Sequence, residues 1–377
     1  MTVRCDFLVI GGGIAGASAG YALAEHGSVI VLEREDQPGY HSTGRSAAQF
    51  TELYGNHVIR SLARISKPFL ENPPEGFTDS KILTPRGALF IATEAQQPQL
   101  RAFAEFAAEE AVPVRELSRD EVCDMVPVMR PDAFRFGLHE PESTDMDVHA
   151  LHGGFLRGLR ERGGQVVTDA EVSILSRDAD RWAVTTRDGA AYQAPIVVNA
   201  AGAWADMVAE MAGVRPVGLV PKRRTAMLFD PPADQNSGNW PLVIDMDEQW
   251  YFKPDAGKLL GSSADETPIE PCDVQPEELD IAIAVDRIER MTSLKVGRID
   301  HRWSGLRTFA KDKTVVVGFA PDAAGFFWLA GQGGYGIETS PAMATATASL
   351  IVDGKLPDSF AELGLSPADI APDRLLG

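Results

Sequence analysis

The segment Asp6-Phe7-Leu8-Val9-Ile10-Gly11-Gly12-Gly13-Ile14-Ala15-Gly16 decides the fold of this chain. It starts with a short apolar run typical of a buried strand and ends in a Gly-x-Gly-x-x-Gly turn formed by Gly11, Gly13 and Gly16. The residues that follow have the composition of a helix and then of a second apolar strand. This order predicts a βαβ unit and therefore a parallel sheet.

The glycine turn has the spacing of a dinucleotide-binding site. In such a turn the first glycine permits a tight bend, the second lets a pyrophosphate approach the backbone, and the third packs helix on strand. The N-terminus of the helix faces the phosphates with its partial positive charge. Glu33, at the end of the second strand, stands where an acid hydrogen-bonds a ribose hydroxyl. A dinucleotide is therefore predicted, although a tight turn without a ligand is the alternative and the turn does not separate NAD from FAD.

Three further segments rich in small residues favour FAD, namely residues 39–48, 199–204 and 331–337. Small residues let the backbone lie against a flat ring, and their N–H groups can bond pyrophosphate, ribitol or flavin edges. A glycine-rich helix N-terminus also stabilises negative charge on a reduced flavin. Glycine packing between helix and sheet is the alternative for some of these glycines, as a polar surface loop is for residues 39–48.

Composition bounds the remaining possibilities. The chain has 377 residues, 44% of them hydrophobic and 24% charged, which suits two globular domains. Its formal net charge of -19 argues against a nucleic-acid partner and against an anionic membrane surface. Neither a signal peptide nor a membrane-spanning apolar run is visible, and Cys5, Cys123 and Cys272 have no metal-ligand spacing. We therefore expect a cytoplasmic protein without a metal site.

The order of patterns along the chain predicts the α/β fold class, with two interleaved domains. Alternating strands with turn signals between residues 219 and 307 indicate a mostly antiparallel sheet, and the last quarter returns to buried strands and a helix. The prediction is a Rossmann-like FAD-binding domain, threaded through a substrate-binding domain that has a mostly antiparallel β-sheet plus helices. We assign residues 1–80, 145–217 and 311–377 to the first domain, and residues 81–144 and 218–310 to the second.

Local patterns add individual elements to this outline. Helical composition predicts helices over residues 17–25, 96–110 and 147–162. Ser118 and Glu121 have the spacing of a helix capping box.

On these motifs the chain resembles the D-amino-acid oxidase superfamily of FAD-dependent oxidoreductases. Within it, the chain is most similar to the soluble bacterial FAD-dependent D-arginine dehydrogenases. The similar stretches span nearly the whole chain: residues 11–16, 41–48, 199–204, 221–224, 251–257, 305–307 and 331–337. Some members attach flavin covalently, but no cysteine lies near residues 307–336 and His41 is the only histidine of the small-residue block, so we expect non-covalent FAD.

The resemblance implies a set of FAD-binding residues from all of these stretches. They are Gly11, Gly13, Ile14, Ala15, Gly16, Glu33, Arg34, Ser42, Thr43, Gly44, Arg45, Ser46, Ala47, Ala48, Gln49, Val172, Ala201, Gly202, Trp204, Gly333, Gly334, Tyr335, Gly336, Ile337 and Glu338.

The resemblance also implies how an amino acid is held. Arg224 and Arg307 would bind its carboxylate with Tyr251, Tyr54 would belong to a loop over the pocket, and Gly334 joins this catalytic set. A planar guanidinium grips a carboxylate through two hydrogen bonds, which would fix Cα against the flavin for oxidation to the imino acid. A surface ion pair is the alternative for each arginine.

Two positions depart from the D-arginine dehydrogenases. Gln49 stands where those enzymes carry a histidine, and Ala88 where they carry the glutamate that binds the substrate guanidinium. Because a buried cation without a carboxylate is costly, we expect a relaxed or apolar side-chain preference, unless another acid substitutes. The predicted pocket comprises Gln49, Ala88, Met246 and Trp250, with Phe90 beside them, and the acids considered as substitutes are Glu52, Asp245 and Asp247.

These features predict an FAD-dependent D-amino-acid dehydrogenase whose imino acid product hydrolyses to a 2-oxo acid and ammonia. No side-chain base is apparent, so the substrate's own amine deprotonation is expected to control the pH profile. An oxidase or dehydrogenase of secondary or N-substituted amino acids, similar to sarcosine or proline, is the first alternative. A non-catalytic flavin-binding regulatory protein and an NAD-dependent dehydrogenase are the others. The expected electron acceptor is a quinone or another carrier, and the sequence does not specify which.

Overall fold

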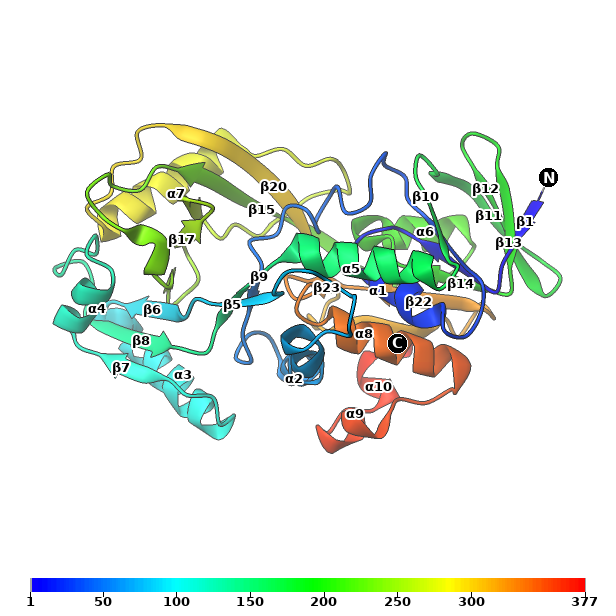
Figure 1. Ribbon diagram of the computed structural model, residues 1–377, viewed down its shortest axis with the longest axis horizontal. Helices are drawn as coiled ribbons and strands as arrows, with labels where there is room; N and C mark the ends of the chain where they lie inside the picture. The colour runs from blue at the N-terminus through cyan, green and yellow to red at the C-terminus, as the bar shows by residue number, and fades with distance from the viewer. Residues whose placement is uncertain (1, 377) are drawn as a thin grey trace.

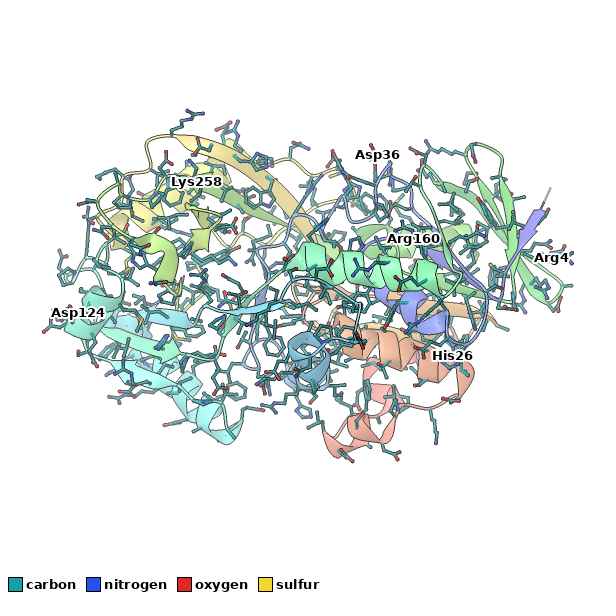
Figure 2. All side chains as sticks on the ribbon, in the orientation of Figure 1. Arg4, His26, Asp36, Asp124, Arg160 and Lys258 are labelled. Atoms are coloured by element: carbon teal, nitrogen blue, oxygen red, sulfur yellow. The ribbon has the colours of Figure 1, made fainter. Side chains whose placement is uncertain are left out.

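A computed structural model describes residues 2–376 of the chain as two lobes (Figure 1). A six-stranded sheet forms the centre of one lobe and a ten-stranded sheet the centre of the other. Figure 2 shows that charged side chains cover both ends, with Asp124 and Lys258 on the lobe of the larger sheet and Arg4 and His26 on the other lobe.

The predicted βαβ unit forms the centre of the six-stranded sheet. Its strand order is β10-β3-β2-β14-β22-β21, and all neighbours are parallel except β21 and β22. The elements are β2 (Phe7–Ile10), α1 (Ile14–Leu23), β3 (Val29–Leu32), β10 (Gln165–Val167), β14 (Ile196–Asn199), β21 (Val316–Phe319) and β22 (Phe326–Ala330). Every residue of β2, β3 and β22 is buried, as expected for strands covered on both faces.

Helices cover one face of this sheet and a second, smaller sheet covers the other. On the first face α1 packs against α5 (Val148–Glu161) and α8 (Ser340–Val352), and α2 (His57–Glu71) packs on α8. The opposite face carries α6 (Ala205–Met211) and a four-stranded sheet made of β1 (Thr2–Arg4), β13 (Ala191–Ala194), β12 (Arg181–Thr186) and β11 (Val172–Asp178).

The ten-stranded sheet is antiparallel except where β16 pairs with β6. In order it contains β23 (Gln332–Gly333), β20 (Ile299–Phe309), β15 (Val220–Phe229), β18 (Lys258–Ser262), β17 (Tyr251–Asp255), β16 (Leu242–Asp245), β6 (Ala88–Ala92), β8 (Phe136–Glu140) and β7 (Arg115–Leu117), with β19 (Thr267–Pro268) paired to β15. Helix α3 (Gln97–Glu109) covers one face, and α4 (Arg119–Met125) and α7 (Glu278–Met291) cover the other.

Short elements connect the lobes and complete the chain. A three-stranded sheet of β4 (Gln49–Phe50), β9 (Thr144–Met146) and β5 (Leu83–Pro85) lies between the two lobes (Figure 1). The remaining elements are α9 (Asp358–Glu362), α10 (Pro367–Ile370) and the 3-10 helices η1 (Glu94–Gln96), η2 (Gly202–Trp204), η3 (Ser237–Asn239) and η4 (Pro372–Leu375). No helix within residues 2–376 has the length and apolar character needed to cross a membrane.

The predicted fold class is confirmed, with local differences. Helix α1 begins three residues before the predicted start because Gly13 is its N-cap and Gly16 lies in its first turns. The capping box of Ser118 and Glu121 is confirmed at the start of α4. The patterns did not predict α2 or α7.

The domain boundaries stay a prediction. All strands of the six-stranded sheet come from the ranges assigned to the FAD-binding domain. The ten-stranded sheet draws its edge strand β23 from residues 311–377, so that C-terminal range contributes to both sheets.

Lys222, Arg223 and Arg224 follow one another on β15. Their surroundings differ because successive side chains of a strand point to opposite faces of the sheet. Arg223 is 5% exposed, and its guanidinium contacts three carboxylates: Asp280 at 2.8 Å, Asp265 at 3.6 Å, and Glu277. Its neighbour Arg224 points instead to the wall of a cavity. Arg223 is therefore a structural residue of the sheet.

Replacing Arg223 by leucine should destabilise the protein by about 3–5 kcal/mol, because the change leaves buried carboxylates without their cation. The midpoint of urea unfolding measures this. Arg290→Leu is the matched control, since Arg290 and its partner Asp286 are 74% and 52% exposed and should contribute at most about 1 kcal/mol. Equal shifts for the two variants would contradict the assignment of Arg223.

Candidate active site

One cavity runs along the edge of the six-stranded sheet where its parallel strands end. The segments after β2, β3, β14 and β22 all contribute to its wall. Of the residues predicted to bind FAD, the wall contains Gly11, Gly13, Ile14, Ala15, Glu33, Arg34, Ser42, Thr43, Arg45, Ser46, Ala47, Val172, Ala201, Gly202, Trp204, Gly333, Gly334, Gly336 and Ile337. Gly16, Gly44, Ala48, Gln49, Tyr335 and Glu338 lie behind or beside this wall.

The glycines of the N-terminal turn are required by close backbone contacts. A Cβ atom on Gly16 would lie 1.8 Å from the Gly11 carbonyl oxygen, and one on Gly11, whose φ is +104°, would lie 2.5 Å from the Ala200 carbonyl oxygen. The N-cap of α1, Gly13, provides no side chain to cap the helix, and the first turn holds no acid. The helix therefore faces the cavity without a cap from its own N-cap residue. The Thr43 hydroxyl accepts from its first N–H, that of Ile14, and a pyrophosphate fits the N–H groups that follow.

Two backbone N–H groups hold the Glu33 carboxylate beside the glycine turn. Glu33 is 7% exposed, and its two carboxylate oxygens accept hydrogen bonds from the Gly12 N–H (2.8 Å) and the Glu35 N–H (2.9 Å). Since each carboxylate oxygen has two lone pairs, further acceptor positions remain on the cavity wall. This arrangement fits the ribose hydroxyls of a dinucleotide.

The glycine turn and Glu33 together form a cradle for a dinucleotide. The loop of residues 39–48 connects this dinucleotide cradle to the ten-stranded sheet. Ser42 Oγ donates to the Leu306 carbonyl (2.6 Å), and Arg45 donates to the carbonyls of Ser304 and Val274 (both 3.1 Å). The Thr43 hydroxyl accepts from the Ile14 N–H at 3.0 Å. The loop thus holds β20 of one lobe against α1 of the other.

The wall offers little for covalent attachment of a flavin. None of the three cysteines lines the cavity. His41 does, but its Nε2 contacts the Glu35 carboxylate at 2.8 Å and its ring packs against Trp204 with centroids 4.7 Å apart. Residues 2–376 also contain no group of three or more His, Cys, Asp or Glu side chains placed to hold a metal ion.

The predicted carboxylate-binding residues gather at the other end of the same cavity. Arg224, Tyr251 and Arg307 all line it, each from a strand of the ten-stranded sheet. Arg307 donates through Nη1 to the Tyr54 hydroxyl oxygen at 3.1 Å. Among the described residues the Arg307 guanidinium has no carboxylate partner, so its charge is available to a ligand.

Tyr54 is suited to assist Arg307. Burial raises the pKa of Tyr54 above its ordinary value even though Arg307 lies beside it, so the phenol stays protonated at neutral pH. Because its oxygen accepts from Arg307, its own O–H is free to donate to a carboxylate.

Residues 6–350 match the protein family described as FAD dependent oxidoreductase. The chain belongs to this family. It is 24% identical over 410 residues to FAD-dependent oxidoreductase domain-containing protein 1 of Xenopus laevis, covering 96% of this chain and 81% of that protein. It is 26% identical over 370 residues to mitochondrial sarcosine dehydrogenase of Mus musculus, covering 93% of this chain and 40% of the relative. The crystal structure of L-proline dehydrogenase from P. horikoshii has the same fold, with a TM-score of 0.85, 21% identity and coverage of 100% and 99%.

In this FAD-dependent oxidoreductase, Arg224 forms the boundary between the cofactor cavity and a second, more open cleft of about 860 Å³. Its guanidinium donates to the Asp265 carbonyl (2.9 Å) and contacts the Glu266 carboxylate (3.4 Å). Glu266 is shared with Lys222 at 2.9 Å. Arg224 is therefore partly compensated by protein groups, whereas Arg307 is not.

None of the four residues of the predicted side-chain pocket lines the cofactor cavity. The prediction that Trp250 lines the pocket is wrong. Trp250 is 3% exposed and packs with Phe252 in the core. It lies on the sheet face opposite to Tyr251, because the side chains of neighbouring residues alternate along a strand. Met246 lines the second cleft and not the cofactor cavity. Ala88 is buried in β6, and the Gln49 amide donates to Ser143 Oγ at 2.6 Å.

The acids considered as substitutes for the missing glutamate all have other partners. Glu52 pairs with Lys67 (2.6 Å) and Arg64 (3.0 Å). Asp245 accepts N–H groups of its own turn, and Asp247 accepts from Gln96 at 2.8 Å.

Sequence reasoning missed one buried acid opposite Ala88, a residue of the predicted pocket. Glu140 is 2% exposed and directly faces Ala88 across the β6–β8 pair. A signal was present, because Glu140 follows Phe136 and Leu138 at intervals of two on the apolar face of a strand. An acid in that position is buried and requires a partner or a proton.

Replacing Glu33 by alanine should weaken FAD binding at least about tenfold, because it removes the carboxylate expected to accept a ribose hydroxyl, a charge-assisted hydrogen bond worth about 1.5–3 kcal/mol. It also removes the acceptor that holds the Gly12 and Glu35 N–H groups in place. Quenching of flavin fluorescence on binding to the apoprotein measures this. Glu25→Ala, which removes an exposed acid paired with Arg162, is the control and should leave the FAD affinity unchanged.

Gly334→Ala should displace the Arg307 guanidinium, since the new Cβ would lie 2.9 Å from its central carbon atom. The expected result is a KM for the substrate raised about tenfold or more, with FAD still bound. Gly153→Ala, a helical glycine with no neighbour within 4 Å of an added Cβ, is the matched control. A normal KM in Gly334→Ala would show that the guanidinium does not need this position.

Proposed function

We propose that this protein oxidises the Cα–N bond of amino acids, with D-amino acids of relaxed or apolar side chain as the first candidate substrates. One observation carries the proposal: Arg307, whose guanidinium is bonded to the Tyr54 hydroxyl, lines the same cavity as the dinucleotide cradle, with Arg224 and Tyr251 on the wall beside it. A cation without a carboxylate partner next to a cofactor cradle is suited to an anionic substrate group.

The protein groups would orient the substrate and the cofactor would provide the redox chemistry. Bound FAD supplies a two-electron acceptor. Arg307 binds the substrate carboxylate through two hydrogen bonds, and the Tyr54 hydroxyl donates a third. Tyr251, which is 7% exposed, closes the wall next to them. Fixing the carboxylate in this way holds Cα at one place against the cofactor. The imino acid product then hydrolyses to a 2-oxo acid and ammonia.

Secondary or N-substituted amino acids are the second candidate substrates. The similarity to sarcosine dehydrogenase over 93% of this chain supports them, because the same carboxylate contacts serve a primary and a secondary amine. A preference for D-arginine, which the resemblance to D-arginine dehydrogenases suggests, is disfavoured by Ala88 and by the existing partners of Glu52, Asp245 and Asp247. A cytoplasmic location and a quinone or other carrier as electron acceptor stay predictions.

The experiment is anaerobic bleaching of the flavin absorbance by a panel of amino acids. D-leucine, D-alanine, D-arginine, sarcosine, D-proline and L-leucine are compared at equal concentration. Fastest bleaching by D-leucine or D-alanine supports the first candidate, and fastest bleaching by sarcosine or D-proline supports the second. A yellow protein that none of them bleaches would be a flavin-binding protein without this activity.

Arg307→Lys should lower kcat/KM about 100-fold while FAD remains bound. Lysine keeps the charge but cannot form two parallel hydrogen bonds, and a charge-assisted bond contributes about 1.5–3 kcal/mol. Arg302→Lys on the same strand is the control, because Arg302 is exposed and contacts only Glu278 at the surface. A small change in kcat/KM for Arg307→Lys would place the substrate carboxylate elsewhere.

A further inference from the structure

A group of buried oxygen atoms without hydrogen-bond partners lies beside the substrate end of the cavity. It comprises Oε2 of Glu140, Oε1 of Glu338 and Oε1 of Gln49. The two glutamates are 2% and 3% exposed. Because buried acceptors are nearly always satisfied, this group requires a proton or a donor that the protein side chains do not provide.

Thr51 joins the two glutamates. Its hydroxyl donates to Oε1 of Glu140 at 2.6 Å, and its N–H donates to Oε2 of Glu338 at 3.4 Å. Glu140 comes from β8 of one lobe, whereas Glu338 precedes α8 of the other. The two carboxyl groups therefore meet across the lobes at a single residue.

The residues of this cluster do not line the cavity, but they lie close to the substrate-binding groups. Glu338 is near enough to Arg307 for the guanidinium charge to act on its carboxyl group. Thr51 lies three residues before Tyr54, whose hydroxyl contacts Arg307. Glu338 directly follows Ile337 of the cavity wall. The Gln49 amide, which donates to Ser143 Oγ and the Gly87 carbonyl, brings its own oxygen to the same region.

Within residues 2–376 neither Glu140 nor Glu338 forms an ion pair. Other acids near the site do, such as Asp145, which lies 2.6 Å from Lys253 and 2.7 Å from Arg86. Two buried carboxylates without a cation cannot both be ionised, so the pair holds at least one proton at neutral pH. Burial raises the pKa of Glu140 to about 7. Burial also raises the pKa of Glu338 well above its ordinary value. Glu140 adds to that rise, and the hydrogen bond from the Thr51 N–H and the charge of Arg307 offset part of it.

We propose that Glu140 and Glu338 are an acid–base pair that acts through Thr51 and takes up the proton released by the substrate's ammonium group. The inference rests on the proposed function, because an amine must lose its proton before its lone pair can support an imine. Before the pair takes up the proton, Glu338 is protonated and Glu140 is ionised. Uptake breaks one N–H bond, forms one O–H bond on Glu140 and changes the charge of the pair from −1 to zero. No group is oxidised or reduced in this step.

The proton content of the pair can be measured without any substrate. Infrared spectra of the FAD-bound protein between pH 5.5 and 10 report the C=O stretch of buried carboxylic acids. At pH 8, above the pKa of Glu140, we expect one such band, absent in Glu338→Gln. A second band should grow as the pH falls through about 7 and should be absent in Glu140→Gln. Glu109→Gln, which removes an exposed acid at the end of α3, should leave both bands in place. Absence of any buried acid band at pH 8 in the wild type would overturn the proposal.

The link to the reaction is tested by the pH dependence of flavin bleaching. In the wild type the bleaching rate should fall as the pH drops through about 7, because Glu140 then becomes protonated and cannot accept. General base assistance contributes about 100-fold or more, so Glu140→Gln should be slower by about that factor at pH 7.5. The variant should recover near pH 10, where the substrate amine is neutral without help.

Three outcomes would count against the proposal. An unchanged pH profile in Glu140→Gln, or an equal loss of rate at every pH, would show that Glu140 has only a structural role. Failure of every amino acid to bleach the wild-type flavin would remove the proposed function and the source of the proton with it. The infrared bands would still show whether the pair holds a proton, so the two failures are distinguishable. Glu338→Gln provides an independent variant for both measurements.

Discussion

The carboxyl ends of β2, β3, β14 and β22 lie at one edge of the six-stranded sheet because these strands run parallel. Each strand therefore delivers its following segment to the same place: the glycine turn, Glu33, the residues around Ala201 and the glycine-rich segment before α8. The turn is possible only with glycine at positions 11 and 16, where an added Cβ would overlap backbone atoms. The substrate wall adds to this edge from the ten-stranded sheet, which the Arg45 loop holds in place.

Features that depend on residues close in sequence could be predicted, whereas features that depend on long-range pairing could not. The glycine spacing predicted the βαβ unit, and the Ser118–Glu121 interval predicted a cap. The contact between Tyr54 and Arg307 joins positions 253 residues apart, so only a family resemblance suggested it. Alternation along β17 fixes that Trp250 and Tyr251 point to opposite faces, but the sequence does not say which face borders the cavity.

Neighbouring cations show why residue type does not reveal role. Lys222, Arg223 and Arg224 are consecutive, yet Arg223 is enclosed by carboxylates while Arg224 reaches the cavity wall. Their difference arises from what packs on each face: α7 supplies Asp280 to one side, and the FAD-binding lobe faces the other. A single sequence shows the three cations but not these partners, which come from residues about 40 to 60 positions away.

The charges at the substrate end are arranged to match a zwitterion. Arg307 contacts a phenol instead of a carboxylate, so its positive charge is not neutralised by the protein. Glu140 and Glu338 contact a threonine instead of pairing with a cation, so the capacity of Glu140 to accept a proton is not neutralised either. If Arg307 were paired with either glutamate, both groups would be satisfied and a substrate would have to break that pair to bind. Keeping Arg307 apart from the two glutamates, with Tyr54 and Thr51 as neutral partners, lowers the stability of the folded protein before a substrate binds. It leaves one group for the carboxylate of an amino acid and the other for the proton of its amine.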